Sequence, residues 1–192
     1  MDSHKAFDSI PWEHLDETLG YMGFSGHWRG LIYECLSTSK MVVLINGSPT
    51  NEFSLQRGLR QGDPLSPFLF DIAVEGLTVL FNRAFSIGYF RGLEIDHGFI
   101  THLQYTDDTL IFSPTNHESL QHVKRILRWY EIISGLKVNF YKSSLIGINL
   151  DEDFTSGIAR GIFCRNDHFP VKYLGLSLGV NPGRLSTWKP VR

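Results

Sequence analysis

The chain has 192 residues, of which 42% are hydrophobic and 20% are charged, a composition that fits a folded domain and excludes a disordered chain. Its net charge of −2 is more acidic than is usual for a freestanding nucleic-acid-binding protein, since such proteins neutralise phosphates with basic residues. Because the sequence has no signal-like stretch and no apolar run near the roughly 20 residues that cross a bilayer, we expect an intracellular protein, nuclear or cytoplasmic, without a membrane partner.

Two helices are predicted first. Residues 8–19 form one helix, because Asp8 or Ser9 can cap its start and Pro11 fits a first helical turn. Its apolar stripe consists of Trp12, Leu15 and Leu19. Residues 26–37 form the second helix.

A β-hairpin and a loop follow. The hairpin has strands at 41–45 and near 53–55, and Asn46 and Gly47 between the apolar runs favour a tight turn. Residues 57–67 contain glycines and prolines without periodicity and predict a structured loop.

The middle of the chain predicts a helix and several short strands. Residues 65–84 are apolar almost all round, so we expect a helix that is buried on all sides. Residues 88–95 predict a strand pair with a turn. Two further strands, 102–105 and 110–112, flank residues 106–109.

Residues 116–134 give the clearest helix, which Gly135 ends. Its apolar face comprises Leu120, Val123, Ile126, Leu127, Tyr130 and Ile133. After it we expect strands near 137–140 and 144–148, a helix near 151–160 and a strand at 173–176. The pattern predicts one α+β domain over residues 1–180 with mostly antiparallel pairing, and a tail at 181–192.

Asp107 and Asp108 are adjacent carboxylates between short apolar strands. In a half-buried hairpin they repel each other and lose hydration, and a bound divalent cation relieves both costs. Mg²⁺ takes hard oxygen ligands of this kind when the substrate supplies phosphates. The pair alone leaves ordinary turn chemistry open, since Asp also favours turns.

Asp2 can complete such a site if it ends a strand that faces the Asp-Asp pair. Three carboxylates could then hold two metal ions about 4 Å apart, which is the arrangement of two-metal phosphoryl transfer. Simpler interpretations remain: Asp2 is an ordinary terminal residue, Asp8 caps a helix, and Phe7 belongs to the core.

The loop from Arg57 to Pro67 could meet an anionic ligand. Its glycines let the backbone approach a ligand closely, its two arginines suit phosphates, and the helix after it aims a positive N-terminus at the loop. The alternative is an ordinary loop between a strand and a helix.

In this order the segments resemble reverse transcriptases of LINE-type (non-LTR) retrotransposons, especially those of plants. The five motifs lie at residues 2–10, 57–70, 105–108, 135–143 and 169–175. The run Arg-Gln-Gly-Asp-Pro-Leu-Ser-Pro at 60–67 is a marker within that family. Thr106 stands where the family usually has alanine, a change that a strand tolerates.

The resemblance implies a polymerase palm, an α+β fold with a mostly antiparallel sheet packed on helices. Such a palm would join a dNTP to a DNA primer on an RNA template. Asp2, Asp107 and Asp108 would bind two Mg²⁺ ions, for which Mn²⁺ can substitute. Phe7 would be the steric gate that excludes a ribose 2′-hydroxyl.

Other roles follow from the same resemblance. Contacts to the nucleotide and template would come from Arg60, Gln61, Gly62 and Tyr105. Lys142 would be catalytic, near the pyrophosphate, as a general acid. The primer grip would consist of Tyr173, Leu174 and Gly175.

Family members place a fingers subdomain before the first motif and a thumb after the fifth, so we expect both to be largely missing from this sequence. One alternative is therefore a catalytically inactive remnant that retains at most nucleic-acid binding. Another is an RNA-recognition-type module, which would need exposed aromatic and basic residues on a strand face. Tyr105 and Phe112 supply aromatics there, but few basic residues accompany them. The sequence does not indicate an oligomeric state.

Overall fold

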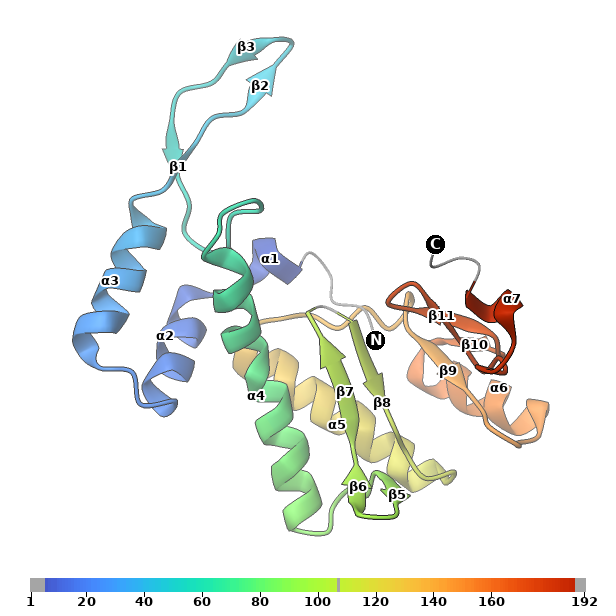
Figure 1. Cartoon of the computed structure of the whole chain (residues 1–192). Coiled ribbons are helices and arrows are strands. Elements are labelled where there is room, and N and C mark those ends of the chain that lie inside the picture. Colours follow the sequence, from blue (N-terminus) through green and yellow to red (C-terminus); the bar gives the residue numbers. More distant parts are fainter. Residues whose placement is uncertain (1–5, 107, 189–192) are drawn as a thin grey trace. The chain divides into compact units, whose positions relative to one another are not determined.

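The computed structural model describes residues 6–106 and 108–188. The chain divides into two compact units, Met1–Val138 and Asn139–Arg192, each of which combines helices with small two-stranded sheets (Figure 1). This mixture confirms the α+β class. Within the described ranges, no helix is long and apolar enough to span a membrane.

The first predicted helix is interrupted. The structure has α1 (Ala6–Ser9) and α2 (Trp12–Tyr21), with Pro11 as the N-cap of α2 at φ −69° and ψ 133°. The prediction of one helix over 8–19 is wrong. The ring of Pro11 clashes with helical dihedrals at the preceding residue, Ile10, so the chain turns there. The stripe of Trp12, Leu15 and Leu19 is buried as expected.

The second helix and the hairpin agree with the sequence patterns. Helix α3 (Gly26–Ser37) is capped by Ser25, whose hydroxyl oxygen accepts from the Trp28 N–H. In the hairpin, β1 (Lys40–Met41) pairs with β4 (Phe53–Ser54) and β2 (Leu44–Ile45) with β3 (Ser48–Pro49). The turn residues Asn46 and Gly47 have φ of 52° and 83°, which identifies the expected tight turn.

Two long helices carry the core of the first unit. Helix α4 (Ser66–Ser86) packs on both α2 and α5 (His117–Ser134). The prediction that α4 is buried on all sides is wrong, since Phe68 is 68% exposed and only one face packs inward. On α5, Ile133 is 55% exposed because it lies outside the narrower stripe formed by Ile126, Leu127 and Tyr130. Gly135 is the left-handed C-cap of α5, as predicted.

Two antiparallel hairpins lie between α4 and α5. The first pairs β5 (Leu93–Ile95) with β6 (Gly98–Ile100), so the end of the predicted segment 88–95 is a strand, but its partner lies beyond the segment. Gly88, at φ 71°, is in the turn that follows α4, and Phe90 is buried. The second pairs β7 (His102–Tyr105) with β8 (Asp108–Ile111), close to the predicted strands.

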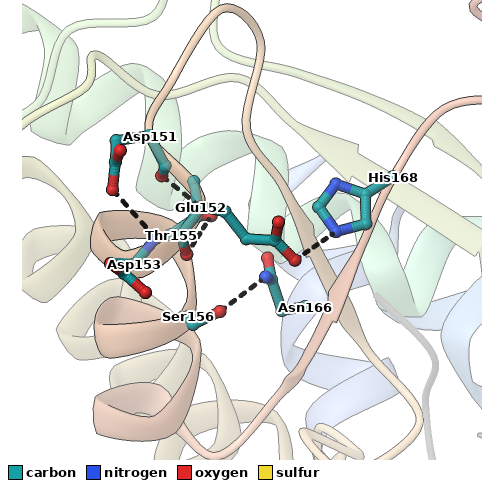
Figure 2. A network of polar contacts seen from close by, with 7 residues as sticks. All are labelled: Asp151, Glu152, Asp153, Thr155, Ser156, Asn166 and His168. Carbon is teal, nitrogen blue, oxygen red and sulfur yellow. Dashed lines mark hydrogen bonds and ion pairs between the residues drawn. The ribbon is translucent and has the colours of Figure 1, made fainter.

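The second unit contains a parallel pair, whereas the other five strand pairs of the described residues are antiparallel, so the prediction of mostly antiparallel pairing is confirmed. Strands β9 (Ser144–Ile146) and β10 (Arg165–Asp167) run parallel, joined by α6 (Glu152–Ile162). Figure 2 shows Asp151 at the start of α6 bonded to Asp153, and Asn166 of β10 bonded to Ser156. The Asp151 side chain also accepts from the Phe154 N–H, and the bond that Asn166 donates to Ser156 is 2.9 Å long. The predicted strand at 137–140 is wrong, since only a one-residue bridge occurs there.

The C-terminal part of this unit is a hairpin and a short helix. Strands β11 (Val171–Tyr173) and β12 (Leu176–Leu178) pair antiparallel. The predicted strand at 173–176 is therefore wrong: Leu174 and Gly175, at φ of 51° and 80°, form the turn. The segment predicted as a tail contains α7 (Leu185–Trp188).

Candidate active site

The first two predicted motifs are held together by backbone hydrogen bonds. The Leu59 N–H donates to the Phe7 carbonyl at 2.7 Å, and the Gly58 N–H donates to the Ile10 carbonyl at 2.8 Å. The indole N–H of Trp12 donates to the Gly58 carbonyl at 2.8 Å, and this bond is buried. Gly58 has a φ of 84°, and a Cβ there would lie 2.7 Å from the carbonyl oxygen of Asp8. Residues 7–12 and the start of the loop therefore form one packed body.

The ring of Phe7 is fixed by an aromatic partner. It stacks on Phe70 of α4 with ring centroids 4.5 Å apart and planes 8° apart. Phe70 is 1% exposed, whereas Phe7 is half-buried. One face of Phe7 thus lies on the core, and the rest of the ring remains accessible from outside.

Arg60, Gln61 and Gly62 are exposed residues of the loop. The loop closes at Asp63, whose carboxylate accepts from the Leu65 N–H at 2.8 Å just before α4 begins. Sequence reasoning gave Asp63 no role, although a short acidic side chain before a helix is a signal for such a turn. A small pocket lies beside the loop, and its lining includes Trp12, Cys35, Arg60 and Asp63.

The β7–β8 hairpin carries the acidic motif at its turn end. Asp108 begins β8 opposite Tyr105, and both side chains are exposed. Thr106 has a φ of 48°, so it lies in the turn and not in a strand as expected from its β-branched side chain. A β-branched residue in this conformation is strained, a feature that concentrates at functional sites. Asp107 lies outside the described residues.

His102 anchors this hairpin to α4, a role that sequence reasoning missed. Its ring stacks on Phe81 with centroids 4.9 Å apart, and its Nε2 and Nδ1 hydrogen-bond the hydroxyls of Thr78 and Thr101 at 3.2 and 2.9 Å. Burial lowers the pKa of His102 below its ordinary value of 6.5, so the ring is neutral near pH 7. One signal for this role is available: side chains alternate between the two faces of a strand, and His102 occupies one of the more buried positions of β7.

Helix α4 contacts both the β7–β8 hairpin, through Phe81, and the segment bonded to the loop, through Phe70. Phe70 and Phe81 lie about three turns apart on one face, or about 16 Å along the axis. Strand β7 runs opposite to α4, toward the N-terminal end of the helix (Figure 1). It starts at His102, which stacks on Phe81. Four strand residues rise about 10 Å, so the turn end with Asp108 points back toward the end of α4 that carries Phe70 and the loop.

The predicted metal ligands are described only in part. Asp2 and Asp107 lie outside the described residues, and no group of three His, Cys, Asp or Glu side chains that could hold a metal occurs within 6–106 and 108–188. Asp108 presents an exposed carboxylate, a hard oxygen donor that fits Mg²⁺. The expected desolvation cost is wrong for Asp108, because its side chain remains in water.

The remaining predicted site residues belong to the second unit. Lys142 is exposed, and its backbone N–H donates to the Asn139 side chain at 3.2 Å in a turn before β9. Tyr173, Leu174 and Gly175 lie at the turn end of the β11–β12 hairpin. Their predicted roles in catalysis and primer binding stay predictions.

Comparison with known proteins identifies the family. The profile of "Reverse transcriptase (RNA-dependent DNA polymerase)" matches residues 1–178. The chain is 28% identical over 181 residues to the transposon TX1 uncharacterized 149 kDa protein of Xenopus laevis, covering 94% of this chain and 13% of that protein. It is 28% identical over 149 residues to the Pol polyprotein of the type-1 retrotransposable element R2 of Popillia japonica, covering 77% and 20% respectively.

A further relative is an uncharacterized mitochondrial protein of Arabidopsis thaliana, 42% identical over 71 residues that cover 36% of this chain and 58% of that protein. The chain thus spans less than two thirds of the length of these relatives. The family match favours the reverse transcriptase interpretation over the RNA-recognition-type alternative and confirms the resemblance to enzymes of non-LTR retrotransposons. The chain belongs to the reverse transcriptase (RNA-dependent DNA polymerase) family.

Proposed function

We propose that this chain is the catalytic palm of a retrotransposon reverse transcriptase, which extends a DNA primer on an RNA template. The observation that carries the proposal is the convergence on α4 of the family-matched segments. Phe7 stacks on Phe70, the loop joins residues 7–12 through Gly58, and the hairpin with Asp108 is fixed to the same helix by His102. Catalytic groups on a rigid element keep the precise geometry that phosphoryl transfer needs.

The proposed metal ligands are Asp2, Asp107 and Asp108. When bound, two Mg²⁺ ions would acidify the primer 3′-hydroxyl and offset the negative charge of the phosphates. The exposed carboxylate of Asp108, at the end of an anchored hairpin, supports its assignment as one of these ligands.

The other residues would position the substrates and move protons. In the reaction the primer 3′-hydroxyl would lose its proton to water, its oxygen would form a bond to the α-phosphorus of the dNTP, and the bond from that phosphorus to pyrophosphate would break. Arg60, Gln61, Gly62 and Tyr105 would contact the nucleotide and template from exposed positions, with Phe7 against the sugar. Lys142 would donate a proton to the leaving pyrophosphate, and residues 173–175 would hold the primer.

Primer extension tests this function. The 192-residue chain is incubated with an RNA template, an annealed DNA primer, dNTPs and Mg²⁺. We expect incorporation that EDTA abolishes and Mn²⁺ restores. D108N should lower the rate by roughly 10³-fold, because a lost metal ligand removes several kcal/mol of charge stabilisation.

The matched control is D96N, which changes an exposed aspartate in the turn of the β5–β6 hairpin of the same unit. Equal losses in D96N and D108N would contradict the assignment of Asp108. A folded wild-type chain that binds template and primer but incorporates no dNTP would establish the inactive remnant instead.

A further inference from the structure

The Phe7 ring has an aromatic support in Phe70. The Leu59 N–H fixes the Phe7 backbone at 2.7 Å, but this bond leaves the side-chain torsions of Phe7 free. Phe70 provides a flat surface only 8° from parallel, at a centroid distance of 4.5 Å. Stacked aromatic pairs contribute about 0.5–1.5 kcal/mol beyond area burial, which is enough to favour one ring orientation over its alternatives.

We propose that Phe70 is a positioning residue for sugar selection: it holds the Phe7 ring in the plane that leaves no room for a ribose 2′-hydroxyl. This inference rests on the proposed function of the chain. Phe70 is 1% exposed and cannot meet a nucleotide itself, so its effect must pass through Phe7.

The mechanism is steric. A gate excludes an added oxygen only when the blocking atoms cannot move aside, and a half-buried ring with an open edge can rotate unless its inner face is supported. Leucine at position 70 would keep most of the apolar volume but would remove the flat surface. The Phe7 ring could then swing, and ribonucleotides would enter more readily.

The test compares incorporation of dNTPs and rNTPs by the full chain in wild type and F70L. The ratio of kcat/KM for dNTP to that for rNTP should fall by about tenfold or more, the scale on which a pocket discriminates one small group. Most of the fall in this ratio in F70L should come from a lower KM for the rNTP. F90L is the matched control, because Phe90 is also 1% exposed and lies in the same unit but does not stack on Phe7. Its ratio should stay at the wild-type value, even if melting shows similar destabilisation.

A double-mutant cycle separates positioning from a general structural effect. F7V should lower the dNTP-to-rNTP ratio of kcat/KM further than F70L does. The double variant F7V/F70L should have the same ratio as F7V, because Phe70 would have no ring to position. Incorporation with an unchanged ratio in F70L, or equal changes in F70L and F90L, would overturn the positioning role alone. A wild-type chain that incorporates neither nucleotide would overturn the proposed function and sugar selection with it.

Discussion

Adding one methyl group at Gly58 should push the loop away from residues 7–12, the two segments that this glycine lets approach closely. In Gly58→Ala the new Cβ would lie 2.7 Å from the Asp8 carbonyl oxygen and 2.9 Å from its carbon, both backbone atoms that cannot rotate away. The residue also has a φ of 84°, which costs an L-residue about 1–2 kcal/mol. Displacing the loop would weaken the bonds to Ile10 and Phe7, each contributing about 1 kcal/mol. We expect a total loss of roughly 3–4 kcal/mol of unfolding free energy.

Gly62→Ala supplies the control for this magnitude. Gly62 has nearly the same φ, 85°, but no atom lies within 4 Å of the position that a Cβ would take there, so only the conformational cost of about 1–2 kcal/mol applies. Urea unfolding followed by circular dichroism measures both variants. The variants should differ by about 2 kcal/mol, well above the error of such titrations. Equal losses would refute the close approach of the loop to residues 7–12.

Three further predictions concern the N-cap of α5, the pH dependence of stability and metal binding. Asn116→Ala should lower the unfolding free energy by about 1 kcal/mol in urea titrations, because the Asn116 side chain accepts from the Ser119 N–H at 2.7 Å. The stability should fall between about pH 7.5 and about pH 5.5, because unfolded His102 takes up a proton near 6.5 while the folded residue, with its lowered pKa, does so only at lower pH. H102Q should flatten this dependence, and an unchanged slope would argue against it. Mg²⁺ should raise the melting temperature of wild type more than that of D108N, and equal shifts would contradict metal binding by Asp108.

Local chemistry made several elements predictable. The turn at Asn46 and Gly47 and the end of α5 at Gly135 follow from backbone conformations that these residues adopt readily. The break before α2 was equally local, but the sequence interpretation placed Pro11 inside a helix and overlooked its effect on Ile10.

Non-local pairing could not be predicted in the same way. The parallel alignment of β9 with β10 depends on how α6 packs, which no short pattern encodes. The stack of Phe7 on Phe70 and the fit of Gly58 against Asp8 are likewise contacts between distant segments. The spacing of the motifs therefore predicts which residues carry the family's chemistry, but it does not predict which residues support them.

The exposure of Asp108 changes the argument for metal binding. A carboxylate in a buried hairpin would need a cation to offset its lost hydration, but the exposed carboxylate of Asp108 keeps its hydration. In water, two unit charges 4 Å apart interact by only about 1 kcal/mol. The hairpin can thus form without metal, since His102, Phe81 and Thr78 hold it. The same helix supports Phe7 three turns away through Phe70. Folding and metal binding should consequently be separable in this chain, so that D108N removes the second while leaving the metal-free unfolding free energy almost unchanged.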